Sequence, residues 1–138
     1  MLLSVKHYTI PIMQLKLPTV LIVEDEKLIQ QALKDKFTFE HFTVLTADNG
    51  QAGLETALEN HPDVILLDLQ MPILDGFGAL EKLRADAWGA QVPVIVLTNK
   101  ETSADVYMTL KNHVQDYFIK AETSLETLVG AVRDILAI

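Results

Sequence analysis

Hydrophobic positions along the chain gather in five short runs rich in valine, isoleucine and leucine. The runs occupy residues 19–23, 43–46, 63–67, 92–97 and 117–119. A strand with one wet face alternates between apolar and polar side chains, whereas a strand buried on both faces is apolar throughout. These runs do not alternate. The pattern therefore predicts a parallel sheet that helices cover on both sides.

Stretches with helical spacing lie between and after these runs. Each carries apolar residues three or four positions apart, as expected of a helix with one buried stripe. The five stripes are Leu28, Ile29, Ala32, Leu33 and Phe37; Ala52, Ala57 and Leu58; Leu80 and Leu83; Val106, Thr109 and Leu110; and Leu125, Leu128, Val129, Val132 and Leu136. Thr123 and Glu126 stand three apart, which predicts a capping box at the start of the last helix.

The order of these elements predicts the fold class. Five strands that alternate with five helices form an α/β fold, a doubly wound five-stranded parallel sheet with right-handed connections. We expect residues 18–138 to form this domain and residues 1–17 to be an N-terminal extension. The extension lacks the basic region and cleavage site of a signal peptide. It is either an adventitious segment, or an added edge strand or dimer contact made through Ile10, Ile12 and Leu15.

Composition narrows the range of partners. No apolar run approaches the roughly 18 to 20 residues that span a bilayer, so we expect no membrane segment. The 138 residues include 11 basic and 19 acidic side chains, and a net charge of −8 disfavours direct contact with nucleic acid. The absence of cysteine excludes disulfides and zinc thiolate sites and fits a cytoplasmic location.

Polar residues follow the predicted strands at their carboxyl ends, where open α/β sheets bind ligands. Glu24 and Asp25 follow the first strand, Asp68 the third and Lys120 the fifth, while Thr98 closes the fourth. Three carboxylates in one crevice repel each other unless a cation is present. Mg²⁺ suits such a site because it takes oxygen ligands and needs no all-protein cage.

The same residues are suited to phosphoryl chemistry. A carboxylate can attack phosphorus, and a hydroxyl and an ammonium can hold the other phosphoryl oxygens. Taken singly, Asp68 could cap a turn, Glu24 and Asp25 could complement a helix dipole, and Thr98 could be an N-cap. The occurrence of these four residues together with Lys120 favours a site for phosphoryl chemistry over these separate structural roles.

Four motifs carry a family resemblance. "VLIVEDE", "VILLDLQMPILDG", "VIVLTNK" and "DYFIKAE" occur in this order at the ends of predicted strands. Together they resemble the receiver domain of two-component response regulators over about residues 18 to 138. The resemblance implies the flavodoxin-like receiver fold.

The resemblance also implies roles for individual residues. Asp68 would be the phosphoacceptor, receiving its phosphoryl group from a histidine kinase or a phosphotransfer protein. Asp25 would bind Mg²⁺ directly and Glu24 through water, with Asp68 and the backbone carbonyl of Gln70 as further ligands.

Five further positions match the family. Thr98 would hydrogen-bond to the phosphoryl group, and Lys120 would pair with it. Tyr117 matches an aromatic residue that family members rotate inward on phosphorylation. Pro72 and Gly76 match the loop after the phosphoacceptor.

Three features depart from the family pattern or extend it. Ala121 replaces a proline that often follows a cis peptide bond, which leaves the isomer of the Lys120–Ala121 bond open. Asn99 replaces a smaller residue beside the threonine. Gln70 and Lys100 are placed to reach an attacking water, so we predict that alanine at both positions alters the lifetime of the acyl phosphate.

The predicted function is that of a stand-alone receiver, a signalling phosphoacceptor and not a conventional enzyme. Phosphorylation would shift an equilibrium in the fourth helix, fifth strand and fifth helix. The resemblance implies that a downstream protein or a second copy binds on this face. The alternative is a pseudo-receiver that acts as a phosphorylation-independent binding or scaffold module. A phosphatase of the haloacid dehalogenase type is disfavoured because Gln70 stands where that class needs a second aspartate.

Overall fold

A five-stranded parallel sheet forms the centre of the protein in the computed structural model, which describes residues 2–5, 8–11, 16–71, 73–99, 108 and 110–138. The strand order is β4–β3–β5–β6–β7. The strands are β3 (Thr19–Val23), β4 (Thr43–Ala47), β5 (Val64–Asp68), β6 (Val94–Thr98) and β7 (Asp116–Ile119). The predicted doubly wound parallel sheet is confirmed.

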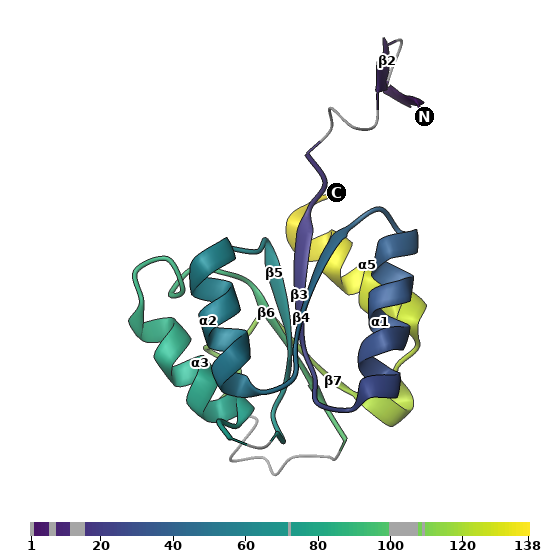
Figure 1. The fold of residues 1–138 in the computed structure, drawn as a ribbon. Helices are drawn as coiled ribbons and strands as arrows, with labels where there is room; N and C mark the ends of the chain where they lie inside the picture. Colours follow the sequence, from purple (N-terminus) through teal and green to yellow (C-terminus); the bar gives the residue numbers. More distant parts are fainter. Residues whose placement is uncertain (1, 6–7, 12–15, 72, 100–107, 109) are drawn as a thin grey trace.

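Helices cover both faces of this sheet (Figure 1). The described helices are α1 (Lys27–Phe39), α2 (Gly50–Asn60), α3 (Gly76–Ala85), the short 3₁₀ helix η2 (Lys120–Glu122) and α5 (Leu125–Leu136). Figure 1 shows α2 and α3 on one face and α1 and α5 on the other. The predicted fourth helix lies mostly outside the described residues, including Val106 and Thr109, whereas Leu110 is described and buried.

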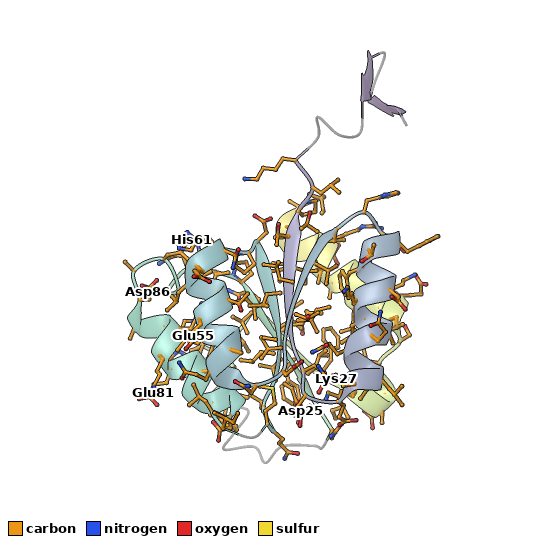
Figure 2. The ribbon with its side chains drawn as sticks, viewed as in Figure 1. Asp25, Lys27, Glu55, His61, Glu81 and Asp86 are labelled. Carbon is orange, nitrogen blue, oxygen red and sulfur yellow. The ribbon has the colours of Figure 1, made fainter. Side chains whose placement is uncertain are left out.

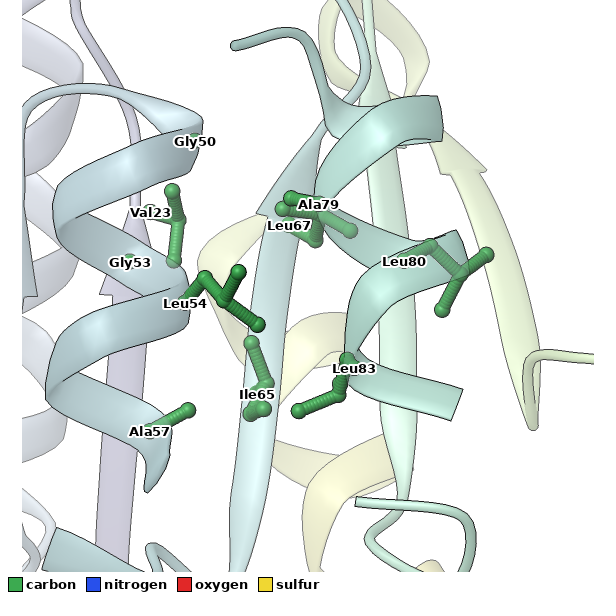
Figure 3. A pocket seen from close by; sticks show the side chains of 10 residues that line it. All are labelled: Val23, Gly50, Gly53, Leu54, Ala57, Ile65, Leu67, Ala79, Leu80 and Leu83. Atoms are coloured by element: carbon green, nitrogen blue, oxygen red, sulfur yellow. The ribbon is translucent and has the colours of Figure 1, made fainter. Parts of the chain in front are cut away.

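The sheet separates two apolar layers. Alternate residues of each strand enter opposite layers, so that Leu21 and Ile65 face α2 and α3 while Ile22 and Leu66 face α1 and α5. Every residue of β5 and β6 is buried. A cavity of about 20 Å³ remains between α2, α3 and the sheet (Figure 3). This close packing holds the central strands, and the side chains at their ends, in fixed positions.

Three predictions about single elements were wrong. Leu28 was assigned to a buried stripe but is 88% exposed, because it precedes the first buried turn of α1. Strands β4 and β7 are half-buried, because they form the edges of the sheet. Helix α5 is capped by Ser124, whose Oγ accepts the backbone N–H of Thr127 at 3.1 Å. The expected cap, Thr123, ends η2 instead.

The N-terminal residues form a separate hairpin. Strands β1 (Leu2–Val5) and β2 (Tyr8–Pro11) pair antiparallel in a two-stranded sheet of their own. The described residues of the extension therefore add no strand to the five-stranded sheet, contrary to one of the alternatives, while Ile12 and Leu15 lie outside the described residues. Among the described residues, no helix has the length and apolar character needed to cross a membrane.

Candidate functional site

The carboxyl ends of the parallel strands bring the predicted residues to one edge. Asp68 is the last residue of β5 and Thr98 the last of β6, and their exposed fractions are 2% and 1%. Glu24 and Asp25 follow β3, and Lys120 follows β7. Figure 2 shows Asp25 at this edge and His61 at the opposite end of the sheet.

Three carboxylates meet at this edge. Oxygen atoms of Glu24, Asp25 and Asp68 all lie within 4.8 Å of one another. Backbone N–H groups orient two of them. Glu24 Oε2 accepts from Glu26 N at 3.2 Å, and Asp68 Oδ1 accepts from Gln70 N at 3.1 Å. The strand ends and the following turns thus fix the acidic cluster.

Lys120 supplies positive charge to the cluster. Its Nζ lies 3.3 Å from Asp68 Oδ2, forms an ion pair with Glu24 and lies 4.0 Å from Glu26 Oε1. The Lys120 side chain is itself largely buried. Since one ammonium contacts Glu24 and Asp68 in a cluster of three carboxylates, the cluster keeps an excess of negative charge when all three are ionised.

Burial affects the pKa values of Glu24 and Lys120. It raises the pKa of Glu24 to about 7, although the hydrogen bond with Lys120 opposes this change. Burial alone would lower the pKa of Lys120, but its contacts with Glu24 and Asp68 outweigh burial and raise that pKa above its usual value. Lys120 therefore stays charged at neutral pH, while Glu24 takes up a proton readily.

The donor set fits a hard divalent cation. Carboxylate oxygens are the ligands that Mg²⁺ prefers, and a cation would relieve the repulsion within the cluster. Glu24, Asp25 and Asp68 are the described residues that offer ligand atoms close together. Gln70 follows Asp68 by two positions, and the role of its backbone carbonyl stays a prediction.

The loop after Asp68 depends on Gly76. A Cβ atom at this position would lie 2.3 Å from the backbone oxygen of Asp68, far inside van der Waals contact. The N–H of Gly76 donates to Leu69 O at 3.1 Å. Glycine therefore lets α3 begin directly against the end of β5. Pro72, the other predicted loop residue, lies outside the described residues.

The structure describes three of the four remaining predicted positions, Tyr117, Asn99 and Ala121. Tyr117 on β7 pairs in register with Val96, is half-buried and packs against the core layer under α2 and α3. The Lys120–Ala121 peptide bond is trans. Asn99 Nδ2 donates to Glu26 Oε1 at 3.2 Å. Lys100 lies outside the described residues.

Two polar residues near the site, Gln30 and Glu26, were missed from the sequence. Gln30 donates to the backbone oxygen of Glu24 at 2.9 Å, and Glu26 links Asn99 to the surroundings of Lys120. Gln30 could have been found, because it lies three residues before Leu33 on the buried face of α1. A polar side chain at such a position needs a hydrogen-bond partner. No comparable pattern in the sequence indicates that Glu26 takes part in the site.

The fold agrees with a family comparison. Residues 20–133 match the family model described as response regulator receiver domain. The chain belongs to this family. The receiver domain is 35% identical over 104 residues to the transcriptional regulatory protein AfsQ1 of Streptomyces coelicolor, covering 75% of this chain and 45% of the relative. It is 34% identical over 117 residues to the response regulator ArlR of Staphylococcus aureus, covering 85% and 52%.

Solved receiver domains share the fold. The receiver domain of Francisella response regulator 1452 has a TM-score of 0.78 and 32% identity, covering 87% of this chain and 97% of that chain. The receiver domain of the sensor histidine kinase PA1611 from Pseudomonas aeruginosa has a TM-score of 0.80 and 25% identity, covering 89% and 100%. The latter structure has a magnesium ion coordinated in its active-site cleft. The chain spans about half the length of the curated relatives cited above.

Proposed function

We propose that Asp68 accepts a phosphoryl group from the phosphohistidine of a histidine kinase or a phosphotransfer protein. The observation that carries the proposal is the buried carboxylate of Asp68, 3.3 Å from Lys120 Nζ and clustered with Glu24 and Asp25. One carboxylate oxygen contacts Lys120, and the other accepts the N–H of Gln70. The nucleophile is thus held at both oxygens.

The chain's own residues divide the work of the transfer. A carboxylate oxygen of Asp68 would attack phosphorus while the bond from phosphorus to the donor's histidine nitrogen breaks, and the histidine leaves with that electron pair. Lys120 would pair with one phosphoryl oxygen, and the hydroxyl of Thr98 would donate to another. Because Lys120 already contacts Asp68, its side chain would reorganise little during the transfer itself.

Glu24, Asp25 and Asp68 would hold Mg²⁺, together with the backbone carbonyl of Gln70. The crowding of three carboxylates within 4.8 Å supports this assignment. The related receiver domain of PA1611 has a magnesium ion in its active-site cleft, at 25% identity to this chain. When bound, the ion would neutralise charge on the transferring group.

The signalling output would be a change in protein contacts, in the cytoplasm. A phosphoryl group adds roughly two negative charges at this edge of the sheet. It would draw Thr98 and Lys120 toward it, with Tyr117 following inward, and so shift the surface formed by the fourth-helix segment, β7 and α5. A downstream protein or a second copy of the chain would bind there.

Acetyl phosphate provides the test. Incubation with this small donor and Mg²⁺ is expected to add one phosphoryl mass to the intact protein, and chelation of Mg²⁺ should prevent it. Asp68→Asn should lose the adduct, whereas the matched control Asp35→Asn, on the exposed face of α1, should keep it. An adduct that survives in Asp68→Asn would refute Asp68 as the phosphoacceptor.

A pseudo-receiver is the second candidate function. The observation that favours it is the hydrogen bond from Asn99 to Glu26, which joins the turns after β6 and β3 beside the cluster. A chain of this kind would bind a partner without phosphorylation. The absence of any adduct in the unsubstituted protein, with both acetyl phosphate and a phosphohistidine donor, would select this function.

A further inference from the structure

The buried polar side chains of the described residues point to one further residue. They are Glu24, Gln30, Asp68 and Thr98. Three of these four belong to the site already described. Gln30, which is 9% exposed on the inner face of α1, has no part in the chemistry proposed above. A buried amide is expensive unless it is hydrogen-bonded, so its partners indicate what it does.

The amide of Gln30 holds the turn that carries the acidic pair. Its Nε2 donates to the backbone oxygen of Glu24 at 2.9 Å, and Ala47 O lies 3.3 Å away. The Glu24 oxygen belongs to the peptide unit that joins Glu24 to Asp25. One hydrogen bond therefore fixes the backbone from which both carboxylates project.

A second anchor lies on the neighbouring loop. Gln30 Nε2 also donates to Asp48 Oδ1 at 2.8 Å, and the same oxygen lies 2.6 Å from Lys27 Nζ. The hydrogen bond from Lys27, followed by that from Gln30, lowers the pKa of Asp48, which keeps it an acceptor. Glu24 N donates to Ala47 O at 3.0 Å. The turn after β3 is thus tied to the end of β4 by side chain and backbone together.

We propose that Gln30 is a positioning residue for the metal site. Through the Glu24–Asp25 peptide it holds both carboxylates facing Asp68, and it acts without touching the cation or the phosphoryl group. The inference rests on the proposed binding of Mg²⁺ by Glu24, Asp25 and Asp68. Loss of a group that orients metal ligands typically weakens metal binding about 10- to 100-fold.

Gln30→Met tests this role, because methionine has a similar size and no donor. We expect Mg²⁺ binding, measured by calorimetry on the full chain, to weaken about tenfold or more. Gln31→Met is the matched control. Gln31 is the next residue of α1, is exposed and bonds to Asp35 at 2.7 Å, so its loss should leave the Mg²⁺ affinity unchanged.

The unfolding midpoint with and without Mg²⁺ separates positioning from general stability. A purely structural role would lower both midpoints equally and leave the Mg²⁺ affinity of Gln30→Met unchanged, which would overturn the inference. If Gln30→Met does not fold, Asp48→Ala removes the outer anchor at the surface. A severalfold loss of Mg²⁺ affinity in Asp48→Ala would support the inference, and an unchanged affinity would overturn it.

The outcome also distinguishes this inference from the proposed function. If the unsubstituted chain binds Mg²⁺ and Gln30→Met weakens the binding, Gln30 is a positioning residue even where acetyl phosphate gives no adduct. If an adduct forms and Gln30→Met binds Mg²⁺ normally, the role of Gln30 alone is refuted. If the unsubstituted chain binds no Mg²⁺, both the metal site and the positioning role of Gln30 are refuted.

Discussion

Glu24 is a buried carboxylate that shares its end of the sheet with Asp68. Lys120 contacts both groups and Glu24 Oε2 accepts one backbone N–H, but the desolvation of Glu24 outweighs these contacts. Burial therefore dominates and raises the pKa of Glu24 to about 7. In the metal-free protein near neutral pH, the cluster can lower its excess negative charge by protonating Glu24.

This proton competes with the metal ion. Mg²⁺ requires the carboxylate form, so binding below pH 7 must release a proton from Glu24. We expect the Mg²⁺ affinity to fall by up to about tenfold for each pH unit below 7 and to level off above pH 8. Calorimetric titrations between pH 5.5 and 8.5 measure this dependence.

Glu24→Gln is the control for the pH dependence. The variant keeps the shape of the side chain and removes its proton equilibrium, so its weaker Mg²⁺ affinity should change little between pH 6 and 8. An unsubstituted protein whose affinity is constant over the same interval would show that Glu24 does not carry the competing proton.

The roles of residues at the strand ends could be predicted from the sequence, whereas the hydrogen-bond partners of the residues that support them could not. Asp68, Thr98 and Lys120 each end or follow an apolar run, and parallel strands bring such positions to one edge. Gln30 is different. Its role depends on a hydrogen bond to the backbone of Glu24, and no side-chain pattern encodes that bond.

At the scale of elements, the sequence predicted whether a segment is a helix or a strand better than it predicted the position and the ends of that element. All five strands of the parallel sheet were predicted, but the apolar runs do not show which strands form its edges. Helix α5 was expected to begin at Thr123, although Ser124 and Thr127 have the same spacing one residue later. The deciding factor is η2, a short turn that engages Thr123. Competition between neighbouring cap residues leaves no periodic pattern in the sequence.

Helix α5 contains an exposed glycine that the fold does not require. A Cβ atom added at Gly130 would meet no atom within 4 Å. Alanine is favoured over glycine inside a helix by about 1 kcal/mol. We therefore expect Gly130→Ala to raise the free energy of unfolding by about 1 kcal/mol, measured by urea denaturation in the presence of chelator.

Gly53→Ala is the contrasting variant. It makes the same change in the interior of α2, where the added Cβ would lie 2.7 Å from the side chain of Val23. Crowding there should outweigh the gain in helix propensity and lower the free energy of unfolding. Equal effects at Gly130 and Gly53 would contradict the assignment of open space around Gly130.

At the scale of the whole molecule, the strand order assembles the site. Because β5 lies between β3 and β6, Asp68 is flanked by the acidic pair on one side and by Thr98 on the other. The sequence contains these residues far apart, and the crossover rules supply the parallel direction that brings them together. The apolar pattern alone does not specify the order of the strands, which the structure gives as β4–β3–β5–β6–β7.

The hairpin formed by β1 and β2 has its own two-stranded sheet, so the five-stranded sheet is complete without it. We expect removal of residues 1–15 to change the free energy of unfolding by less than about 0.5 kcal/mol and to leave phosphorylation of Asp68 intact. Urea denaturation and the acetyl phosphate assay measure the two effects.

Removal of residues 1–21 is the control. It also deletes Val20 and Leu21, which are fully buried in β3, and should prevent folding. A large loss of stability in the shorter truncation would show that the hairpin packs against the receiver domain and that the domain begins before residue 18.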